Sequence, residues 1–401
     1  MKARSWLVVI CLGVGSTLAA AQPDPIVTPE PPATSPTVTK PEAPAKPTIT
    51  IGGYLETHYQ LNLRRPSNQI TALRGFDNRD RTFTLANAAL DVKGERGPLT
   101  ARLILQVGTT GSTYYLAEPA LPGASGVNAS GSELWKYLQT ATLAYQAPKA
   151  ILVEAGLFLS PIGPEVIPIK DNWSYSRSNL FFGLPAYHTG ARVSRPLGGG
   201  WTGTFALYSG WNSVVDNNRT PSVAVSALYT SPSTTAQVLY FGGNERASGA
   251  PEGKAWRHLL DAYAQVAIND ELSLLVHGDV GAERNTFGTS GWAAGQVQAK
   301  YQLTPKLYAA LRGDYFREWV ADDSGMTASA IFWPTEWMAS GTATLALAPT
   351  DGLSIRLEYR HDQANDDVFF AGDVAGDGAA MPFVPDNDQQ DTITLGAVAW
   401  F

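Results

Sequence analysis

The last ten residues, which read T-I-T-L-G-A-V-A-W-F, constrain the fold more than any other stretch of the chain. Their alternation predicts a strand with two distinct faces. A strand this apolar would promote aggregation as an exposed edge in water. In a closed membrane barrel, lipid meets one face and both edges are paired. One face carries Ile393, Leu395, Ala397, Ala399 and Phe401, and the other carries Thr392, Thr394, Gly396, Val398 and Trp400.

From Ile49 onward, sixteen segments have strand character, mostly with an apolar residue at every second position. Their lengths suit the tilted crossing of a bilayer, which takes about 9–11 residues. We expect an all-β, transmembrane, antiparallel up-and-down barrel of about sixteen strands. The segments lie near 49–61, 81–93, 99–109, 135–146, 150–160, 185–195, 200–210, 221–231, 233–243, 257–268, 271–281, 290–302, 306–318, 335–348, 352–362 and 390–401.

The connections alternate in length, as they do in outer-membrane barrels with short periplasmic turns and longer outer loops. This parity predicts an even strand count and both termini in the periplasm. Tight turns are expected near 94–98, 147–149, 196–199, 232, 269–270, 304–305 and 349–352. Longer loops are expected at 62–80, 110–134, 161–184, 211–220, 244–256, 282–289, 319–334 and 363–389.

Two strands depart from strict alternation. The second changes phase around Asn87, and the fourth places Gln139 on the lipid side. A β-bulge at either place would restore the pattern, because one extra residue shifts the side chains to the other face.

Aromatic residues on the outward parity gather at strand ends, where two girdles are expected at the headgroups. The periplasmic girdle is predicted to contain Tyr145, Trp201, Tyr229, Tyr301 and Phe401. The outer girdle is predicted to contain Tyr187, Trp292, Tyr315, Trp337 and Tyr359. Aliphatic positions such as Leu103, Val153, Leu157, Val276 and Leu357 belong to the same face.

The inward parity is polar and charged, as the wall of a water-filled channel requires. Charges there would be costly in lipid, whereas in a lumen they are solvated or paired across strands. For any single residue the alternative is a structural ion pair. The set contains Glu56, His58, Arg102, Glu154, His188, Arg192, Asp261, His277, Asp279, Lys300, Arg312, Asp314, Arg356, Glu358, Arg360 and Asp362.

The third long loop, 161–184, carries more apolar residues than a solvated loop would. We expect it to fold into the lumen and narrow it. Its Glu165, Lys170, Asp171 and Arg177 would then form a charged constriction opposite wall residues such as Arg192, which would set size and charge preference. The alternative is an exposed, rigid cap over the other loops. The predicted constriction and lumen residues are Glu165, Lys170, Asp171, Arg177, Arg192, Glu154, Asp261, Arg312, Arg356, Glu358 and Arg360.

The N-terminus predicts export. Residues 1–21 have the charged, apolar and small-residue regions of a secretory signal peptide. Cleavage there would remove Cys11, the only cysteine, and would take the formal charge from −7 to −9 by removing Lys2 and Arg4. A nucleic-acid partner is therefore not expected. Residues 22–47 are rich in Pro, Ala, Thr and Glu, which favours an extended periplasmic tether before the barrel of 48–401.

Four motifs resemble those of one known family, the OmpL-like β-barrel porins (porin-2 type) of Gram-negative outer membranes. They are G-G-Y-L-E at 52–56, P-I-G-P-E-V with D-N-W-S-Y-S-R-S-N-L-F-F within 161–182, Y-H-T-G-A-R at 187–192 and G-W-N-S-V-V-D-N-N at 210–218. The resemblance implies diffusion of small solutes without a cofactor. The C-terminal strand, ending in Phe, is similar to the sorting strand by which the barrel assembly machinery recognises such proteins.

No catalytic or metal motif is expected. The chain lacks a Gly-x-Ser-x-Gly elbow, a His-Glu-x-x-His pair and a phosphate loop. Acidic stretches near 362–373 and 386–391 are interpreted as solvated loop tips, because Ca²⁺ needs six or more converging oxygens. The five histidines, which show no ligand-like spacing, are His58, His188, His258, His277 and His361.

The sequence therefore predicts an outer-membrane porin for small hydrophilic solutes and ions, with weak charge selectivity and no enzymatic activity. A channel selective for a sugar or organic anion, and a plugged structural or adhesive barrel, remain alternatives. The expected partners are outer-membrane lipid and lipopolysaccharide, the assembly machinery and the solutes. A homo-oligomer such as a trimer is left open.

Overall fold

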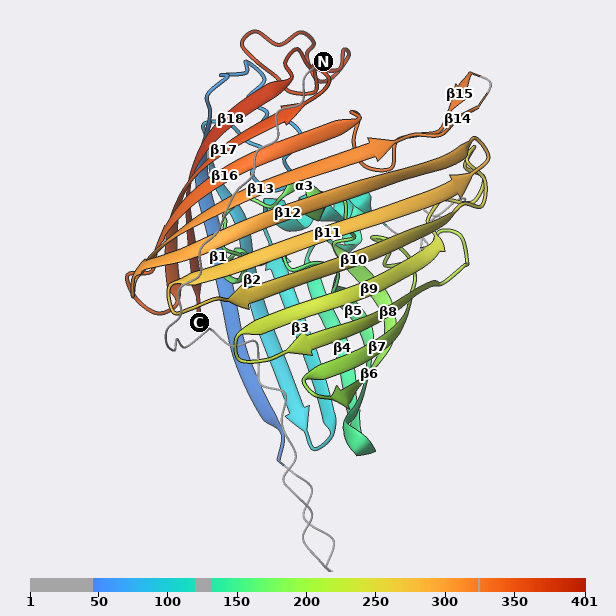
Figure 1. Cartoon of the computed structure of the whole chain (residues 1–401), viewed down its shortest axis with the longest axis vertical. Coiled ribbons are helices and arrows are strands. Elements are labelled where there is room, and N and C mark those ends of the chain that lie inside the picture. Colours follow the sequence, from blue (N-terminus) through green and yellow to red (C-terminus); the bar gives the residue numbers. More distant parts are fainter. Residues whose placement is uncertain (1–45, 120–130, 324) are drawn as a thin grey trace, which may run out of the picture.

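The computed structural model describes residues 46–119, 131–323 and 325–401, which form a closed barrel (Figure 1). The predicted signal peptide and nearly all of the predicted tether lie outside the described residues. Within the described part, sixteen antiparallel strands pair in the order β1-β18-β17-β16-β13-β12-β11-β10-β9-β8-β7-β6-β5-β4-β3-β2, and β2 returns to β1. The predicted fold class and strand number are confirmed.

Each barrel strand joins its sequence neighbour, so the topology is up-and-down throughout. The strands are β1 (Thr48–Asn62), β2 (Phe83–Arg96), β3 (Leu99–Val107), β4 (Leu138–Ala147), β5 (Ile151–Leu159), β6 (Tyr187–Gly198), β7 (Trp201–Tyr208), β8 (Ser222–Thr230), β9 (Thr234–Asn244), β10 (Trp256–Ala267), β11 (Leu272–Asn285), β12 (Gly288–Thr304), β13 (Leu307–Trp319), β16 (Trp337–Leu347), β17 (Leu353–Ala364) and β18 (Gln389–Trp400).

The first and last strands close the barrel. β1 pairs with β18 in one continuous register, from Tyr54 opposite Trp400 to Asn62 opposite Thr392. Leu395 is 53% exposed, whereas Thr394 beside it is 1% exposed. The alternation predicted for the C-terminal segment is therefore present. It identifies the even-numbered residues of β18 as the face that points into the barrel.

Short helical elements occupy the connections. α1 (Thr109–Tyr114), η1 (Tyr115–Ala117) and α2 (Ser132–Trp135) follow β3, and η3 (Pro148–Ala150) joins β4 to β5. η4 (Ile169–Asp171) and α3 (Asn179–Phe182) belong to the connection after β5. A short hairpin projects from the rim (Figure 1). Its two strands, β14 (Asp322–Asp323) and β15 (Met326–Thr327), have two residues each. None of the described helices has the length and hydropathy to cross a bilayer.

Seven tight turns alternate with eight outer connections, as the sequence predicted. We name the outer connections L1 (63–82), L2 (108–137), L3 (160–186), L4 (209–221), L5 (245–255), L6 (286–287), L7 (320–336) and L8 (365–388). The prediction of a longer loop at 282–289 is wrong. β11 and β12 continue to pair up to Asn285 opposite Gly288, which leaves a two-residue turn.

Both irregular strands contain the expected bulges. The β1–β2 register shifts so that Glu56 pairs with Asn87 while Thr57 pairs with Leu85. The β3–β4 register shifts between Ile104 and Leu105, and Gln139 is the extra residue. The second bulge turns Gln139 into the barrel, where its Nε2 donates to Tyr54 Oη at 2.6 Å.

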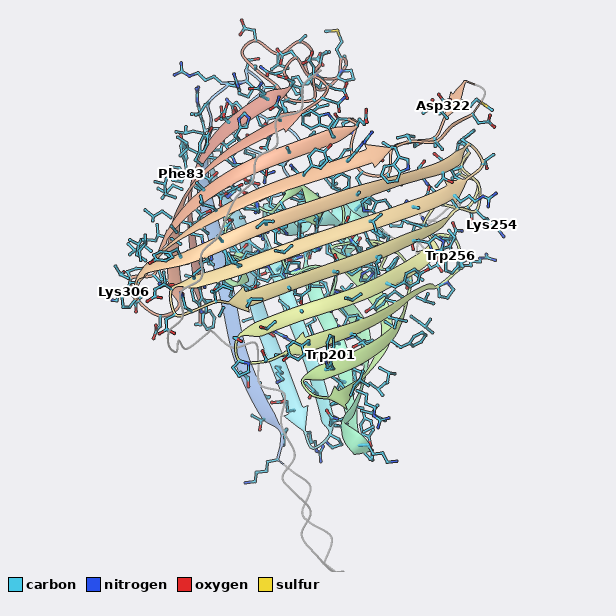
Figure 2. The ribbon with its side chains drawn as sticks, in the orientation of Figure 1. Phe83, Trp201, Lys254, Trp256, Lys306 and Asp322 are labelled. Carbon is cyan, nitrogen blue, oxygen red and sulfur yellow. The ribbon has the colours of Figure 1, made fainter. Side chains whose placement is uncertain are left out.

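Most of the aromatic residues predicted for the girdles lie on the outer surface. Figure 2 shows Trp201 and Lys306 toward one end of the barrel and Lys254 and Asp322 toward the other. Their contact with headgroups stays a prediction. The exposed fractions are 45% for Tyr145, 43% for Trp201, 50% for Tyr301, 46% for Tyr315, 44% for Tyr359 and 83% for Phe401, while Tyr229 and Trp337 are half-buried.

Two girdle assignments are wrong. Trp292 is fully buried and faces inward, because its neighbour across the ladder is Gly281, where a Cβ would lie 2.0 Å from the indole. Tyr187 is fully buried, because L2 covers it with Tyr115 at a ring-centroid distance of 4.5 Å. Leu157, predicted to meet lipid, is buried in the same aromatic cluster.

We expect the inward bulge at Gln139 to contribute measurably to stability. In Gln139→Ala, the Tyr54 hydroxyl and the Gln106 amide oxygen lose a buried partner, which should cost about 1–3 kcal/mol of the free energy of unfolding. Urea unfolding of the purified barrel measures it. Gln146→Ala, at the exposed end of the same strand, is the control and should change little. Equal effects of both substitutions would contradict this role of the bulge.

Candidate functional site in the barrel lumen

L3 lies inside the barrel, where carboxylates of the wall hold its backbone. Glu358 on β17 accepts hydrogen bonds from the backbone N–H of Tyr175 at 2.6 Å and of Ser176 at 3.0 Å. Glu56 on β1 accepts from Ile169 N at 2.5 Å. Both carboxylates stand on the inward face and are at most 2% exposed. These contacts position L3 against the wall from several strands at once.

Arginines of the same wall bind the carbonyl side of L3. Arg312 on β13 donates to Glu165 at 2.9 Å and to the carbonyl of Ser176 at 2.7 Å. Arg356 on β17 donates to the carbonyl of Ser174 at 2.9 Å. Charge-assisted bonds of this kind are about twice as strong as neutral ones. L3 is therefore held through both its donors and its acceptors.

Arg360 completes this set of anchors. It donates to the carbonyl of Arg177 and, at 2.8 Å, to the side chain of Asn179 at the start of α3. Asp362 neutralises it at 2.6 Å. The guanidinium is thus fully desolvated yet has both a counter-charge and acceptors, which offsets the cost of burying it.

Apolar contacts fix the two ends of L3. Ile162, Leu180 and Leu184 belong to a buried cluster with Leu259 and Phe316 of the wall. Near the middle of the loop, Ile169 and Tyr175 pack on Val398 of the last strand. Gly396 makes this approach possible, because a Cβ there would lie 2.1 Å from the Tyr175 ring. The structure therefore places L3 inside the barrel, as expected from its apolar content.

The opposite wall, β2 to β7, keeps its charged groups in contact with water. Arg102 pairs with Asp91 at 2.6 Å, and Arg192 pairs with Glu154 at 2.7 Å. The Arg102 and Arg192 side chains are 41% and 25% exposed, against 0% for Arg312. The lumen is therefore asymmetric, with a dry side under L3 and a hydrated side facing it.

The predicted constriction residues separate into two groups. Lys170 and Asp171, which form an exposed ion pair at 2.9 Å, together with Glu154 and Arg192, retain contact with solvent. The others cannot line a water-filled passage, because they are buried. This second group contains Glu165, Arg177, Asp261, Arg312, Arg356, Glu358 and Arg360.

L1 adds a network that the sequence analysis missed. Arg74 contacts both Asp77 and Asp362, the latter at 3.2 Å, and Gln60 Nε2 donates to Asp77 at 3.2 Å. Burial of Asp77 favours its neutral form, but Arg74 and Arg360 outweigh this and hold its pKa below the usual range. A single Arg-x-x-Asp in a loop is too common a pattern to have indicated this role.

Residues of several outer loops, Phe182 of L3 among them, line an open cavity of about 480 Å³. Its lining is rich in aromatic rings, and Arg257 lies over the ring of Trp211 at 5.3 Å. The carboxylate of Glu245 accepts from Trp211 N at 2.6 Å; burial raises its pKa above the usual value. The main lining residues are Phe182, Trp211, Asn212, Glu245, Arg257, Phe332 and Trp333.

Among the described residues, one group has metal-ligand types close enough together to hold an ion. Ligand atoms of Asp261, His277 and Asp279 all lie within 4.8 Å of one another. The sequence analysis did not predict a metal site here.

We expect loss of the Glu358 anchor to loosen L3 without opening the barrel. In Glu358→Ala, the N–H groups of Tyr175 and Ser176 lose their acceptor, each bond to a charged group being worth about 1.5–3 kcal/mol. Amide hydrogen exchange at 174–177 should accelerate about tenfold or more, while exchange in the strands stays slow. Glu154→Ala, on the hydrated wall, should leave exchange in L3 unchanged. Unchanged exchange in Glu358→Ala would show that L3 does not depend on this anchor.

We expect Asp77 to make the free energy of unfolding depend on pH in the acidic range. The pKa of Asp77 is lower in the folded state than in the unfolded state, where it is about 3.9. Its contribution to the free energy of unfolding is therefore fully present above the unfolded pKa and is lost as pH falls through the folded pKa. Asp77→Asn should lose on the order of 3 kcal/mol at neutral pH, and the difference from wild type should shrink in strong acid. Urea unfolding at both pH values measures this. Asp351→Asn, in an exposed turn, should match wild type; a pH-independent loss in Asp77→Asn would refute the assignment.

Comparisons with known proteins agree with this architecture. Solved structures of similar fold include the anion-selective porin from Comamonas acidovorans, with a TM-score of 0.56, 12% identity and coverage of 89% of this chain and 100% of that chain. The outer-membrane expressed OmpT of Vibrio cholerae has a TM-score of 0.56 and 10% identity, and the match covers 91% of this chain and 100% of that chain. The outer membrane channel DcaP of Acinetobacter baumannii has a TM-score of 0.55 and 13% identity, and the match covers 88% of this chain and 97% of that chain.

At these identities the likeness to solved structures is one of fold. No curated protein matches the chain in sequence. The family described as "Putative beta-barrel porin-2, OmpL-like" matches residues 48–401, which is the whole barrel. The chain therefore belongs to the OmpL-like porin-2 family, and it is a β-barrel porin of the outer membrane.

Proposed function

We propose that the barrel is a passive diffusion channel for small hydrophilic solutes and ions, which pass between L3 and the wall formed by β2 to β7. The observation that carries this proposal is the asymmetry of the lumen. Charged pairs keep contact with water on one side, where Glu154 and Arg192 face the barrel interior. On the other side, residues such as Arg312 and Glu358 are sealed beneath the loop.

Charge selectivity along this passage is expected to be weak. The hydrated groups occur as pairs of opposite sign, Arg102 with Asp91, Arg192 with Glu154, and Lys170 with Asp171. A strong preference requires a ring of charges of one sign at the narrow point. Paired charges present a dipole to a passing ion instead, so size should discriminate more than sign.

A solute-selective channel is the second candidate, favoured by the cavity under the outer loops. Four aromatic side chains line it, together with Asn212 and Glu245. Apolar walls with a few placed polar groups are typical of small-molecule sites. A solute held there would reduce ion current on binding, which a plain diffusion channel would not show. Although the Comamonas protein is described as anion-selective, the paired charges of this lumen support no such preference.

The remaining assignments rest on the outer surface of the barrel. The exposed apolar residues, Leu357 and Val276 among them, support contact with outer-membrane lipid and lipopolysaccharide, and the C-terminal strand supports insertion by the barrel assembly machinery. A homo-oligomer is compatible with the fold, since the Vibrio cholerae OmpT is described in a trimer form. The family and the fold are those of a channel rather than an enzyme, and we propose no catalytic activity and no cofactor.

Single-channel recording in a salt gradient tests the proposed passage. Lys170→Gln removes a solvated cation from L3 and should shift the reversal potential toward cation preference. Asp171→Asn removes its partner and should shift it toward anion preference. Each shift should amount to several millivolts, because one charge of a mixed set changes.

Lys254→Gln supplies the matched control, since this exposed lysine stands on L5 at the rim of the barrel (Figure 2). It should keep the wild-type reversal potential. If Lys170→Gln and Asp171→Asn also keep it, the passage does not run beside L3. A folded protein that gives no conductance steps would replace the channel proposal with a plugged barrel.

A further inference from the structure

Two carboxylates stand opposite each other on the dry side of the lumen, and among the described residues neither pairs with a lysine or an arginine. Asp261 on β10 and Asp279 on β11 are direct partners in the antiparallel ladder. Both point inward, and they are 0% and 6% exposed. Like charges opposite one another in a ladder are destabilising, and burial removes the water that would screen them.

Three other buried acids of the inner wall are compensated differently. Glu283 has Arg246 and Arg257, each at 2.7 Å. Glu358 accepts two backbone N–H groups of L3, and Glu318 accepts several of L7, including Trp333 N at 3.0 Å. Each of these carboxylates is matched to a cation or to a set of aligned donors, as burial of charge requires.

The Asp261–Asp279 pair has fewer compensating cations and hydrogen-bond donors. Among the described residues, Asp261 accepts from His277 Nε2 at 2.5 Å, and Asp279 accepts from the Trp292 indole at 3.0 Å. Asp261 Oδ1 and Asp279 Oδ2 are buried with no hydrogen-bond partner in the described structure. Two orphaned carboxylate oxygens beside an imidazole indicate that a positively charged ligand belongs here.

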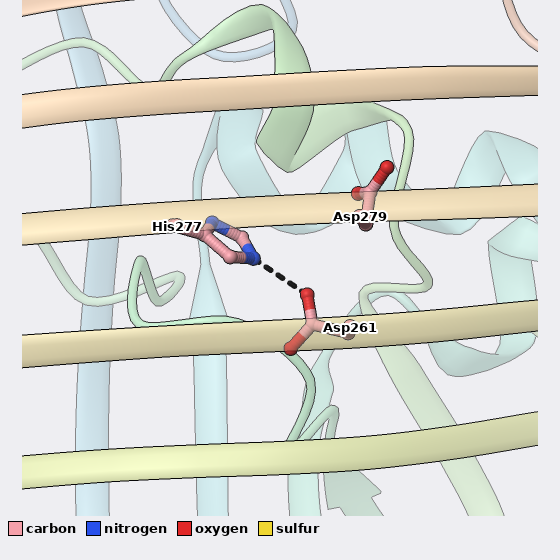
Figure 3. A group of neighbouring side chains, drawn as sticks. All are labelled: Asp261, His277 and Asp279. Carbon is pink, nitrogen blue, oxygen red and sulfur yellow. Dashed lines mark hydrogen bonds and ion pairs between the residues drawn. The ribbon is translucent and has the colours of Figure 1, made fainter.

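The ligand atoms of the three side chains are already near one another. They lie within 4.8 Å, and Figure 3 shows His277 and Asp261 pointing toward each other with Asp279 beside them. We propose that Asp261, His277 and Asp279 bind a divalent metal ion of the kind that accepts mixed nitrogen and oxygen ligands, with Zn²⁺ as the type case. Imidazole nitrogen favours such ions over Ca²⁺ and Mg²⁺, and two carboxylates supply the counter-charge.

Hydrogen bonds on both ring nitrogens fix the orientation of His277. Gln296 Nε2 lies 3.2 Å from His277 Nδ1 and donates to Glu165 of L3 at 3.0 Å. The amide N–H donates to Nδ1, so Nε2 carries the ring proton, which Asp261 accepts, and a metal ion at Nε2 would have to displace that proton.

The site adjoins the foot of L3. A Cβ on Gly163 would lie 3.0 Å from the His277 ring, so L3 packs directly on the proposed ligand. A bound ion would fix that ring and, through Gln296, the Glu165 anchor. Any effect of the bound ion on ion current, through the position of L3, rests on the proposed channel function. Metal binding itself does not.

Equilibrium dialysis of the folded, untagged, chelator-treated protein against Zn²⁺ alone tests the site. Wild type should bind one ion per chain, and Asp279→Asn and Asp261→Asn should each lower the affinity at least about tenfold. Asp351→Asn is the control and should bind as wild type does. No binding by the wild type, or wild-type affinity in both variants, would overturn the proposal.

Unfolding in urea separates a lost ligand from a lost fold. Without metal, Asp279→Asn should be at least as stable as wild type, because it relieves the repulsion. Zn²⁺ should then stabilise wild type and not the variant, since only an ion bound to the folded state raises stability. Equal stabilisation of both would overturn the site. Because neither readout uses conduction, a silent channel that binds Zn²⁺ would refute the proposed function and leave the metal site standing.

Discussion

Closure of the sheet is the constraint on which the rest of this structure depends. A strand in lipid has no water to satisfy its backbone, so each N–H and C=O must find a partner on a neighbouring strand. Pairing of β1 with β18 meets that requirement for the first and last strands. Closure also fixes two environments, lipid outside and an enclosed space inside. In the part of a strand that lies in the membrane, a charged residue must therefore point inward, where its partners come from the wall or from a loop.

Much of this could be predicted from the sequence because alternation is local. The two-residue period gives the parity of each strand, and a break in it indicates a bulge, as Gln139 illustrates. What alternation cannot give is the length of a strand beyond the membrane, which is why the pairing up to Asn285 was missed. Nor does it show a neighbour across the ladder. Trp292 has the parity of the inward Lys300, and its ring finds room beside Gly281, which is eleven residues away in sequence with a turn between them.

The candidate site shows the same limit in another form. The sequence indicated that Arg312, Arg356 and Arg360 point inward, and they do, but it did not indicate what covers them. Whether an inward charge meets water or protein depends on where L3 lies, which is set by contacts between residues more than a hundred positions apart, such as Glu358 with Tyr175. The buried arginines bind backbone carbonyls because a loop without regular secondary structure has many unpaired acceptors. They therefore shape the lumen by holding L3 rather than by meeting the solute.

This division of labour accounts for the weak discrimination among ions that we propose for a barrel holding many charges. Charges under L3 are matched to fixed donors and acceptors and are shielded from the passage by the loop. The few that remain hydrated are paired, so the field that a solute meets is smaller than the charge count suggests. The Asp261–Asp279 pair is the exception on the dry side, since its charges are opposed rather than matched. A bound cation would neutralise this pair locally, as neighbouring ions and hydrogen-bond donors do for the other buried charges of the wall.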